Sequence, residues 1–347
     1  MIKIASSTKT LICIGTGGVG KTTLAASIGV GFANQGKKVL VLTIDPSQRL
    51  AQALGIKLDG EIHAVKISGK GELWSCVINH QKTFEYFIRT AAEKNNAAVE
   101  KLLKNRLYLQ LSGRLSGSQD FTSLVSLYRH VSGAEYDLVI LDTPPSQHTW
   151  NFLKAPEKIS NLFNEGIAKW FRQIDGEKPG VFKKIINLGT TQVLRALETL
   201  TGSQFIKELS AFFQAIQNWQ KPLENYVMNC HRLLTSPNTE FLLVTALDPS
   251  RLAEAQKLCR EIKTQGYKLT SLVINRVPVW LKSKTEVDSG RLNELLKYYK
   301  SLEIDLYARL AQFKTQLKVY KCFELRQDSE NVQSLQNNFD QITLLDD

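Results

Sequence analysis

The sequence predicts an α/β fold with a mostly parallel sheet, helices on both faces of the sheet, and a helical insertion subdomain. Two observations support this prediction. Short, nearly uninterrupted apolar runs alternate with helical patterns, which is typical of parallel strands buried on both faces. A glycine-rich loop directly follows the first of these runs, where a strand would pass into a helix. With 347 residues, the chain is long enough for one large domain or for one domain with a sizeable insertion.

The glycine-rich loop is a complete phosphate-binding motif. It reads Gly-Thr-Gly-Gly-Val-Gly-Lys-Thr-Thr after the apolar run Leu11–Ile14, and it fills the pattern G-x-x-x-x-G-K-[ST]. Glycines allow several backbone N–H groups to point at one polyphosphate, and the positive end of the following helix adds to the attraction. The predicted fold is therefore that of a P-loop NTPase. The residues expected to bind the nucleotide phosphates are Gly15, Thr16, Gly17, Gly18, Val19, Gly20, Lys21, Thr22 and Thr23.

Two side chains of this loop distinguish a site for a nucleoside triphosphate from a site for a dinucleotide. Lys21 is expected to act as a catalytic residue on the β- and γ-phosphates, and the Thr22 hydroxyl is expected to bind Mg²⁺. The stretch also fits the weaker fingerprint Gly-x-Gly-x-x-Gly of a dinucleotide-binding oxidoreductase, with Asp45 placed as its ribose-binding carboxylate. A dinucleotide needs neither the ammonium nor the hydroxyl, so the pair favours a nucleoside triphosphate. Guanine specificity is disfavoured because no Asn-Lys-x-Asp motif occurs.

Two later apolar runs end at carboxylates. Val39–Ile44 precedes Asp45, and Leu138–Leu141 precedes Asp142. Ligands of parallel sheets bind beyond the carboxyl ends of the strands, so both acids are expected near the phosphates. Asp142 is expected to serve Mg²⁺ through water, and Asp45 is expected to orient the attacking water as a catalytic residue close to the metal. The alternatives are that Asp142 caps the next turn and that Asp45 caps a helix at Arg49–Leu54.

Two later apolar runs complete the predicted sheet, and a helical segment precedes them in the chain. Phe241–Thr245 and Leu269–Ile274 are expected strands that bracket a helix at Arg251–Ile262. The predicted P-loop domain comprises residues 1–150 and 240–347, and residues 151–239 form the helical subdomain. In that subdomain apolar residues recur with a helical period from Val193 to Val227. This face either packs within the protein or forms a groove for a client.

Composition constrains location and partners. No run approaches the about 18 apolar residues of a membrane-spanning helix, and the N-terminus carries no signal-peptide pattern. Five scattered cysteines without a C-x-x-C motif predict free thiols in a reducing cytoplasm and no local zinc site. The net charge of +11 is compatible with an acidic partner, an anionic membrane or nucleic acid. From Arg276 to Lys321 bases interleave with acids, which favours a solvated helix surface, and no nucleic-acid partner is expected.

Three segments together resemble the anion-transporting ATPase family, which comprises the arsenite-pump ATPases and the targeting ATPases for tail-anchored membrane proteins. These segments are the phosphate loop, residues 45–50 and residues 142–149. The third follows the family pattern Asp-Thr-Ala-Pro-Thr-Gly-His-Thr but departs from it at Pro144, Ser146 and Gln147. Further similarity runs through residues 115–120, 151–156 and 272–277, so the resemblance spans nearly the whole chain.

The resemblance implies an ATPase that uses ATP and Mg²⁺ and couples ATP binding and hydrolysis to a change acting on a protein or membrane-protein partner. It implies that Asn275 hydrogen-bonds the adenine, that Arg276 belongs to the nucleotide site, and that the loop near Phe323 covers the base. It also implies that the segment ending at His148 is the second switch. The family belongs to the dimeric deviant-Walker-A ATPases, so a dimer in the cytoplasm, free or at the inner membrane face, is expected.

One departure from the family concerns assembly. The family usually carries a lysine just after the first glycine of the loop, which reaches the nucleotide of the partner subunit, whereas this chain has Thr16. Such a cation in trans can be worth about 10³–10⁵ in rate. Three alternatives follow: a heterodimer with a lysine-bearing paralogous ATPase, a homodimer in which Arg49 substitutes, or a weakly hydrolysing regulatory subunit.

Other departures bear on the partner. The missing C-x-x-C argues against a zinc-clasped dimer, and Met1 and Met228 are the only methionines, which excludes a Met-lined client groove. The cysteine spacing offers no evident arsenite triad, and the single phosphate loop differs from the tandem arsenite-pump ATPases. Driving an arsenite or anion pump is therefore the less favoured alternative.

Overall fold

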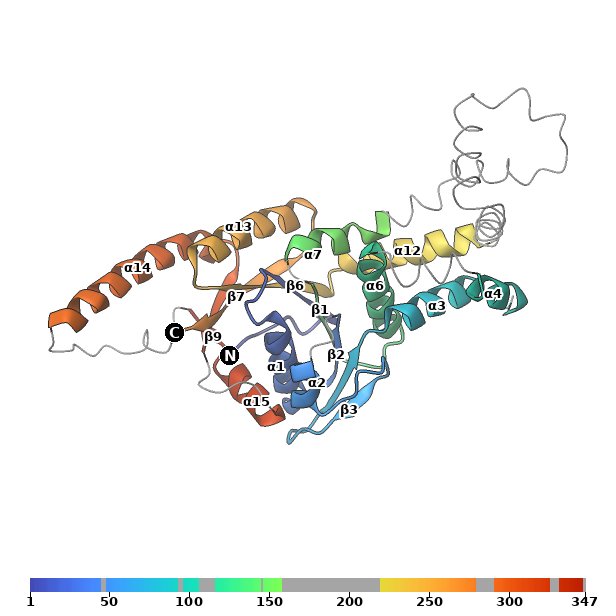
Figure 1. Ribbon diagram of the computed structural model, residues 1–347, viewed down its shortest axis with the longest axis horizontal. Coiled ribbons are helices and arrows are strands. Elements are labelled where there is room, and N and C mark those ends of the chain that lie inside the picture. Colours follow the sequence, from blue (N-terminus) through green and yellow to red (C-terminus); the bar gives the residue numbers. More distant parts are fainter. Residues whose placement is uncertain are drawn as a thin grey trace, which may run out of the picture. The chain divides into compact units, whose positions relative to one another are not determined.

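The computed structural model describes residues 1–44, 48–92, 96–105, 116–144, 146–157, 219–278, 290–324 and 331–345 (Figure 1). The chain divides into two compact units, which are treated separately below. The sheet unit comprises Met1–Ile78, Ser126–Asn151 and Arg232–Asp347. The helical unit comprises Asn79–Val125 and Phe152–His231.

The sheet unit is built on a nine-stranded sheet with the order β3-β4-β2-β5-β1-β6-β7-β8-β9. Its seven inner strands are parallel, and the short edge strands β3 and β9 are antiparallel to their neighbours. The strands are β1 (Thr10–Gly15), β2 (Lys38–Thr43), β3 (His63–Val65), β4 (Glu72–Val77), β5 (Leu138–Asp142), β6 (Thr239–Ala246), β7 (Leu269–Val277), β8 (Lys318–Phe323) and β9 (Thr343–Leu344). This is the α/β fold of a P-loop NTPase.

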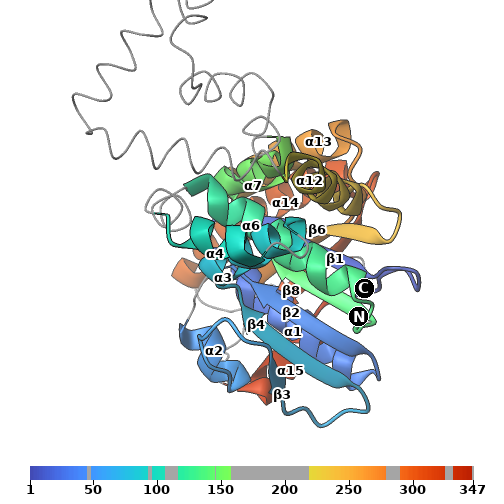
Figure 2. The same cartoon turned by 90° about the vertical axis from the view of Figure 1, so that its right-hand side faces the viewer.

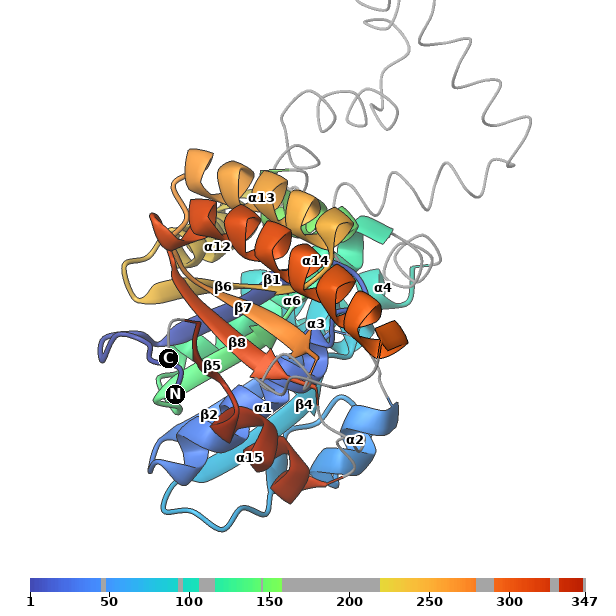
Figure 3. The ribbon, with the colours of Figure 1, turned by 90° about the vertical axis from the view of Figure 1, so that its left-hand side faces the viewer.

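Helices cover both faces of this sheet, as the parallel connections require (Figures 2 and 3). One face carries α1 (Lys21–Asn34), α2 (Gln48–Leu54) and α15 (Val332–Asp340), and the other carries α13 (Pro249–Thr264) and α14 (Gly290–Lys314). Helix α1 lies in the apolar core against α15, where the rings of Phe32 and Phe339 meet edge to face at 5.8 Å. Helix α1 is thereby fixed under the central strands.

Local sequence signals set where these helices begin. The carboxylate of Asp248 accepts hydrogen bonds from the backbone N–H groups of Ser250 and Arg251, each at 3.0 Å, and Pro249 fits the first turn of α13. Asn331 starts α15 with a reciprocal capping box that includes Ser334. Helix α1 begins differently, because its cap residue is a glycine.

The helical unit contains α3 (His80–Ala91) and α4 (Asn96–Leu103), together with parts of α6 (Ser116–Ser132), α7 (Ser146–Leu153) and α12 (Gln220–Leu234). The ring of Phe87 contacts Phe121 at 4.9 Å and Tyr226 at 5.3 Å. Within the predicted apolar face, Leu223 and Val227 are buried. Its members from Val193 to Ile216 lie outside the described residues.

The five predicted strands and the helices at residues 49–54 and 251–262 are present. Four strands were not anticipated: β3, β4, β8 and β9. Residues 318–321, which the charge pattern placed on a solvated helix surface, instead belong to β8, where Val319 and Tyr320 are buried. All five cysteines are free and buried. In the described part of the chain, no helix is long and apolar enough to cross a membrane.

Candidate nucleotide site

The phosphate loop leaves the sheet at the end of β1, which is buried along its whole length between β5 and β6. A side chain at Gly15 would collide with the carbonyl oxygen of Val244 on β6, so only glycine fits this close approach. The N–H of Thr16 donates to the same carbonyl at 3.3 Å. The start of the loop is therefore tied to a central strand.

The loop then turns into α1, whose cap residue is Gly20. Gly18 and Gly20 have positive φ angles of 74° and 80°, which favour glycine. No side chain among the described residues caps the N-terminus of α1. Uncapped N–H groups and the positive end of a helix are the features that attract a phosphate.

Behind the loop, one carboxylate accepts hydrogen bonds from the hydroxyl groups of two segments. Asp142 ends β5 and is 1% exposed. Its Oδ2 accepts hydrogen bonds from Thr22 Oγ1 at 2.5 Å and from Thr43 Oγ1 at 3.1 Å. The strand register brings these residues together, because Asp142 pairs with Thr43 on β2 and with Cys13 on β1. Asp142 is thus held directly beside the loop hydroxyl that is expected to bind Mg²⁺.

The sequence interpretation missed Thr43 as a site residue, and it placed Thr143 in the second switch without anticipating its contacts. Thr43 is a buried hydroxyl at the end of an otherwise apolar strand, which is the signal that could have identified it. Thr143 donates to the carbonyl of Cys13 through both its N–H, at 3.2 Å, and its Oγ1, at 2.8 Å. It therefore fixes the segment after β5 against the segment before the loop.

The donor set fits Mg²⁺, which is bound through hard oxygen ligands and usually keeps several waters. The Thr22 hydroxyl and the Asp142 carboxylate supply such oxygens side by side. Within the described ranges, no group of three or more His, Cys, Asp or Glu side chains could hold a metal alone. Phosphate oxygens and water would have to complete the shell, as is usual for Mg²⁺ at a nucleotide.

Charges under the loop are arranged around a thiol that stays neutral. Burial raises the pKa of Cys13 far above its usual value, and the negative charge of Asp142 raises it further, whereas Lys21 acts in the opposite direction. A thiol with such a raised pKa is protonated at neutral pH and is a poor nucleophile. Cys13 therefore belongs to the apolar core and is not one of the charged groups of the site.

The end of β7 holds the loop from the other side. Asn275 is buried, and its Nδ2 donates to the carbonyl of Val19 at 2.7 Å. The next residue, Arg276, donates from Nη1 to the carbonyl of Gly18 at 3.2 Å and has a positive φ of 54°. Two adjacent residues of one strand thus bind two adjacent carbonyls of the loop. The sequence interpretation placed both residues in the site but did not anticipate these contacts.

Of the other expected site residues, the structure describes some and leaves others outside the described residues. Phe323 ends β8, pairs with Val277 and is half-buried, two strand positions beyond Asn275. Asp45 lies outside the described residues, as do the side chains of Arg49 and His148. The structure therefore brings together the loop, Asp142, Asn275 and Arg276.

The sequence matches a known protein family over most of its length. The family described as anion-transporting ATPase matches residues 8–322, a range that contains the loop, Asp142, Asn275 and Arg276. The chain is 26% identical over 288 residues to ATPase GET3 of Candida glabrata, covering 79% of this chain and 74% of that protein. It is equally similar, with the same coverage, to ATPase GET3 of Kluyveromyces lactis.

A bacterial relative covers slightly more of the chain. The putative arsenical pump-driving ATPase 2 of Aquifex aeolicus is 24% identical over 303 residues, which are 83% of this chain and 89% of that protein. The family match extends over most of the sequence and includes the whole described nucleotide site. The chain belongs to the anion-transporting ATPase family and is an ATPase.

Proposed function

We propose that this ATPase hydrolyses Mg-ATP at the junction of residues 15–23, Asp142 and the end of β7, and that it couples hydrolysis to a protein partner. The observation that carries the proposal is the hydrogen bond between Thr22 Oγ1 and Asp142 Oδ2 beneath an uncapped helix N-terminus. A hydroxyl and a carboxylate at this place can share one hydrated Mg²⁺ next to the phosphates.

Each residue of the junction has a distinct part in this proposal. The loop N–H groups and the Lys21 ammonium bind the phosphates and offset their negative charge. Mg²⁺, when bound, would offset the charge that develops on the phosphate oxygens. Asp45, which follows β2, orients and polarises the attacking water. Asn275 and Arg276 keep the loop carbonyls turned away from the phosphates, because they bind those carbonyls on the other side.

The working unit is proposed to be a dimer whose second cation comes from elsewhere than position 16. Thr16 is fully buried, and its Oγ1 has no hydrogen-bond partner among the described residues. The Thr16 side chain carries no charge and is buried, so it offers no cation to the nucleotide of a partner subunit. A lysine-bearing paralogue, or the nearby Arg49 of this chain, would supply the cation. If neither does, this chain acts as a weakly hydrolysing regulatory subunit.

A protein partner is favoured over an arsenite pump as the proposed target. One relative is named for driving an arsenical pump. In this chain, however, every cysteine is buried, so no thiol is offered to a soluble oxyanion. The segment after Asp142 leads directly into α7, and a γ-phosphate contact there could reposition that helix and signal the nucleotide state.

Nucleotide selectivity tests the assignment of the site. Calorimetry of the purified chain should detect ATP binding in the presence of Mg²⁺, and Lys21→Ala should abolish it. Tight binding of NADH without affinity for ATP would instead support the oxidoreductase alternative. For the partner, Asp45→Asn should bind ATP but hydrolyse it slowly, so it should enrich a partner from native lysate relative to Lys21→Ala. Equal recovery with both variants would contradict the coupled function.

A further inference from the structure

A buried polar network links the helix that follows the phosphate loop to strand β8. Asn338 lies on α15 and is 5% exposed. Its Nδ2 donates to Ser27 Oγ on α1 at 3.1 Å, and its Oδ1 accepts from Cys322 Sγ on β8 at 3.0 Å. Ser27 and Cys322 are completely buried. One amide therefore joins three elements of the sheet unit, α1, α15 and β8.

The surroundings of this amide are otherwise apolar. Its neighbours Leu335 and Phe339 on α15 belong to the core, and the Phe339 ring packs so closely on α1 that a side chain at Gly31 would collide with it. An apolar side chain of similar volume at position 338 would fill this core equally well. Hydrogen bonds are directional where apolar contacts are not, so the amide fixes the register of α1 against α15 and β8. A polar residue that departs from an apolar pattern in this way points to a functional role.

The two outer elements of the network both lead to the carboxyl edge of the sheet, where the candidate nucleotide site lies. Ser27 is five residues beyond Thr22 on α1, which is about 7.5 Å along the helix. Cys322 directly precedes Phe323, the last residue of β8, which pairs with Val277 at the end of β7. The network thus connects the phosphate-binding helix to a strand end on the far side of β7.

The proposed site gives the bound nucleotide a direction along this edge. Thr22 and Asp142, which are proposed to share Mg²⁺, lie where β1 adjoins β5. Mg²⁺ at a nucleotide bridges the β- and γ-phosphates, so the γ-phosphate end of ATP would face β5. In the strand order, β7 and β8 lie on the other side of β1. The base would therefore extend toward the end of β8.

We propose that Asn338 is a positioning residue, which holds α1 and the end of β8 in the register that lets the phosphates and the base of ATP bind together. The inference rests on the proposed function, because it requires ATP in this site. Asn338 is buried, so it acts through α1 and β8. Without the amide the phosphate loop keeps its contacts with β6 and β7, but its alignment with β8 is lost. The loss should therefore affect ATP and spare a ligand that has phosphates alone.

Asn338→Leu tests this with two ligands, because leucine keeps the approximate volume and removes both hydrogen bonds. Binding of ATP and of tripolyphosphate, each with Mg²⁺ in excess, is measured by calorimetry on the full chain. ATP affinity should fall about tenfold, whereas tripolyphosphate affinity should stay within about twofold of wild type. A purely structural role of Asn338 would lower both affinities alike or neither.

Two further variants show whether the three side chains act as one network. Ser27→Ala removes only the partner of the Asn338 Nδ2, so it is the milder change and keeps the test informative if Asn338→Leu does not fold. It should weaken ATP selectively, and adding it to Asn338→Leu should cause no further loss. Cys322→Ser retains a donor for the Asn338 Oδ1 and should bind both ligands like wild type.

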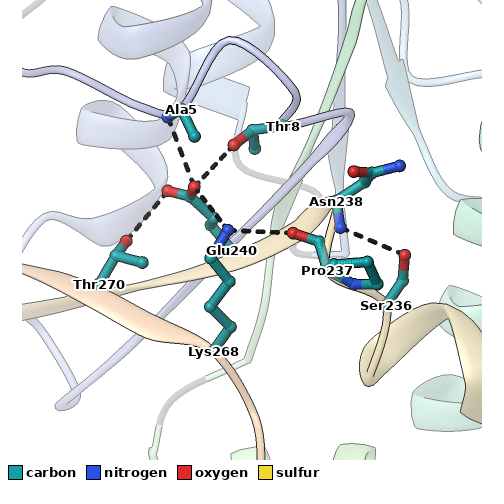
Figure 4. A network of polar contacts seen from close by, with 8 residues as sticks. All are labelled: Ala5, Thr8, Ser236, Pro237, Asn238, Glu240, Lys268 and Thr270. Carbon is teal, nitrogen blue, oxygen red and sulfur yellow. Dashed lines mark hydrogen bonds and ion pairs between the residues drawn. The ribbon is translucent and has the colours of Figure 1, made fainter.

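Thr8→Val is the control for loss of a buried hydrogen bond away from the nucleotide. Thr8 Oγ1 donates to Oε1 of the buried Glu240 at 2.7 Å (Figure 4). Glu240 pairs with Leu11 on β1, four positions before Gly15, so about 13 Å of strand separates this contact from the loop. Thr8→Val should lower the midpoint of urea unfolding but bind both ligands like wild type.

The inference is overturned if Asn338→Leu and Ser27→Ala bind ATP like wild type, or if they weaken tripolyphosphate as much as ATP. It is also overturned if Thr8→Val shows the same selective loss of ATP. If wild type binds ATP no more tightly than tripolyphosphate, the base adds nothing and the inference fails, whereas the proposed function stands. If wild type does not bind ATP, the proposed function itself fails, and the inference fails with it.

Discussion

At the residue scale, the nucleotide site depends on a few short contacts that cross the sheet. Asp142 accepts hydrogen bonds from the hydroxyl groups of Thr22 and Thr43, and the strands on both sides of β5 fix its position at the end of that strand. A carboxylate that is buried and hydrogen-bonded in this way is preorganised, so little rearrangement would be needed at the proposed site for phosphate and metal. Substitutions at Asp142 should therefore affect the metal requirement more than the fold.

Asp142→Asn tests this directly. The amide keeps the size of the side chain but removes its charge, so the Mg²⁺ concentration needed for half-maximal ATP binding should rise by about 10- to 100-fold. The measurement is ATP binding in a Mg²⁺ titration. Thr43→Val is the matched control, because it removes one hydrogen bond to Asp142 and should cost about 1 kcal/mol of stability with little change in the Mg²⁺ requirement. An unchanged titration for Asp142→Asn would contradict the assigned role.

Glu240 predicts a pH dependence of stability that does not involve the nucleotide. Burial alone would raise the pKa of Glu240, but hydrogen bonds from Thr8, Lys268 and Thr270 outweigh burial and lower the pKa below its usual 4.5. The unfolded state then binds the proton more tightly than the folded state, so this contribution is present above about pH 4.5 and is lost as the pH falls through the folded pKa. Urea unfolding of Glu240→Gln should show a weaker loss of stability below pH 4.5 than wild type. Parallel curves for the two proteins would refute this.

At the scale of elements, the strands explain both what the sequence predicts and what it leaves out. The runs that became β1, β2, β5, β6 and β7 are almost wholly apolar, because these central strands are covered on both faces. Strands β4 and β8 lie nearer the edges and carry exposed Glu72 and Lys318, so they resemble loops or helix surface in the sequence. Strands β3 and β9 are too short for any periodicity.

The candidate site also has a part that the sequence predicts and a part that it does not. The loop is contiguous, so its residues and their order follow from one motif. The contacts Thr43–Asp142 and Asn275–Val19 join segments that are far apart in the chain, and they exist only because of the strand order β2-β5-β1-β6-β7. Strand order and register depend on packing of the whole sheet, which no local pattern encodes.

Strand β7 is predicted to support the loop in addition to any contact with the base. Asn275→Ala would leave the buried carbonyl of Val19 without its donor, a loss of about 1–3 kcal/mol, so ATP affinity should fall about 5- to 150-fold. Tripolyphosphate, which has no base, should lose affinity by a similar factor. Arg276→Gly removes the neighbouring hydrogen bond to Gly18 without backbone strain, since glycine accepts the positive φ at position 276, so it should weaken both ligands as well. If Asn275→Ala weakens ATP but leaves tripolyphosphate unchanged, Asn275 acts on the adenine alone.

Helix α15 is predicted to depend on its N-terminal cap. Asn331 accepts a hydrogen bond from the N–H of Ser334 at 2.9 Å, and Asn331→Ala removes it while leaving the contact of Phe339 with Phe32. The free energy of unfolding should fall by about 1 kcal/mol, with an unchanged slope in urea. A surface change on the same helix, Gln333→Ala, provides the comparison. Equal midpoints for the two variants would show that the cap contributes nothing.

At the scale of the whole molecule, the proposal requires two nucleotide sites to meet. Turnover per chain should therefore rise with protein concentration, or should appear only when a lysine-bearing paralogue is added. Arg49→Ala separates these cases: it should abolish activity of a homodimer that uses Arg49 and leave a paralogue-dependent activity intact. The measurement is steady-state ATP hydrolysis over a range of chain concentrations. An active monomer, with the same turnover at every concentration, would contradict the dimer.

The central claim is that ATP is hydrolysed at the junction of the phosphate loop and Asp142. Single-turnover release of phosphate from ATP tests this claim most directly. It is measured at high chain concentration, and where the chain needs the lysine-bearing paralogue, that paralogue carries alanine at its own counterpart of Lys21. Wild type should release phosphate only when Mg²⁺ is present, Lys21→Ala should release none, and Asp142→Asn should need more Mg²⁺ to reach the same rate. Phosphate release by Lys21→Ala at the wild-type rate, or release that is independent of Mg²⁺, would contradict it.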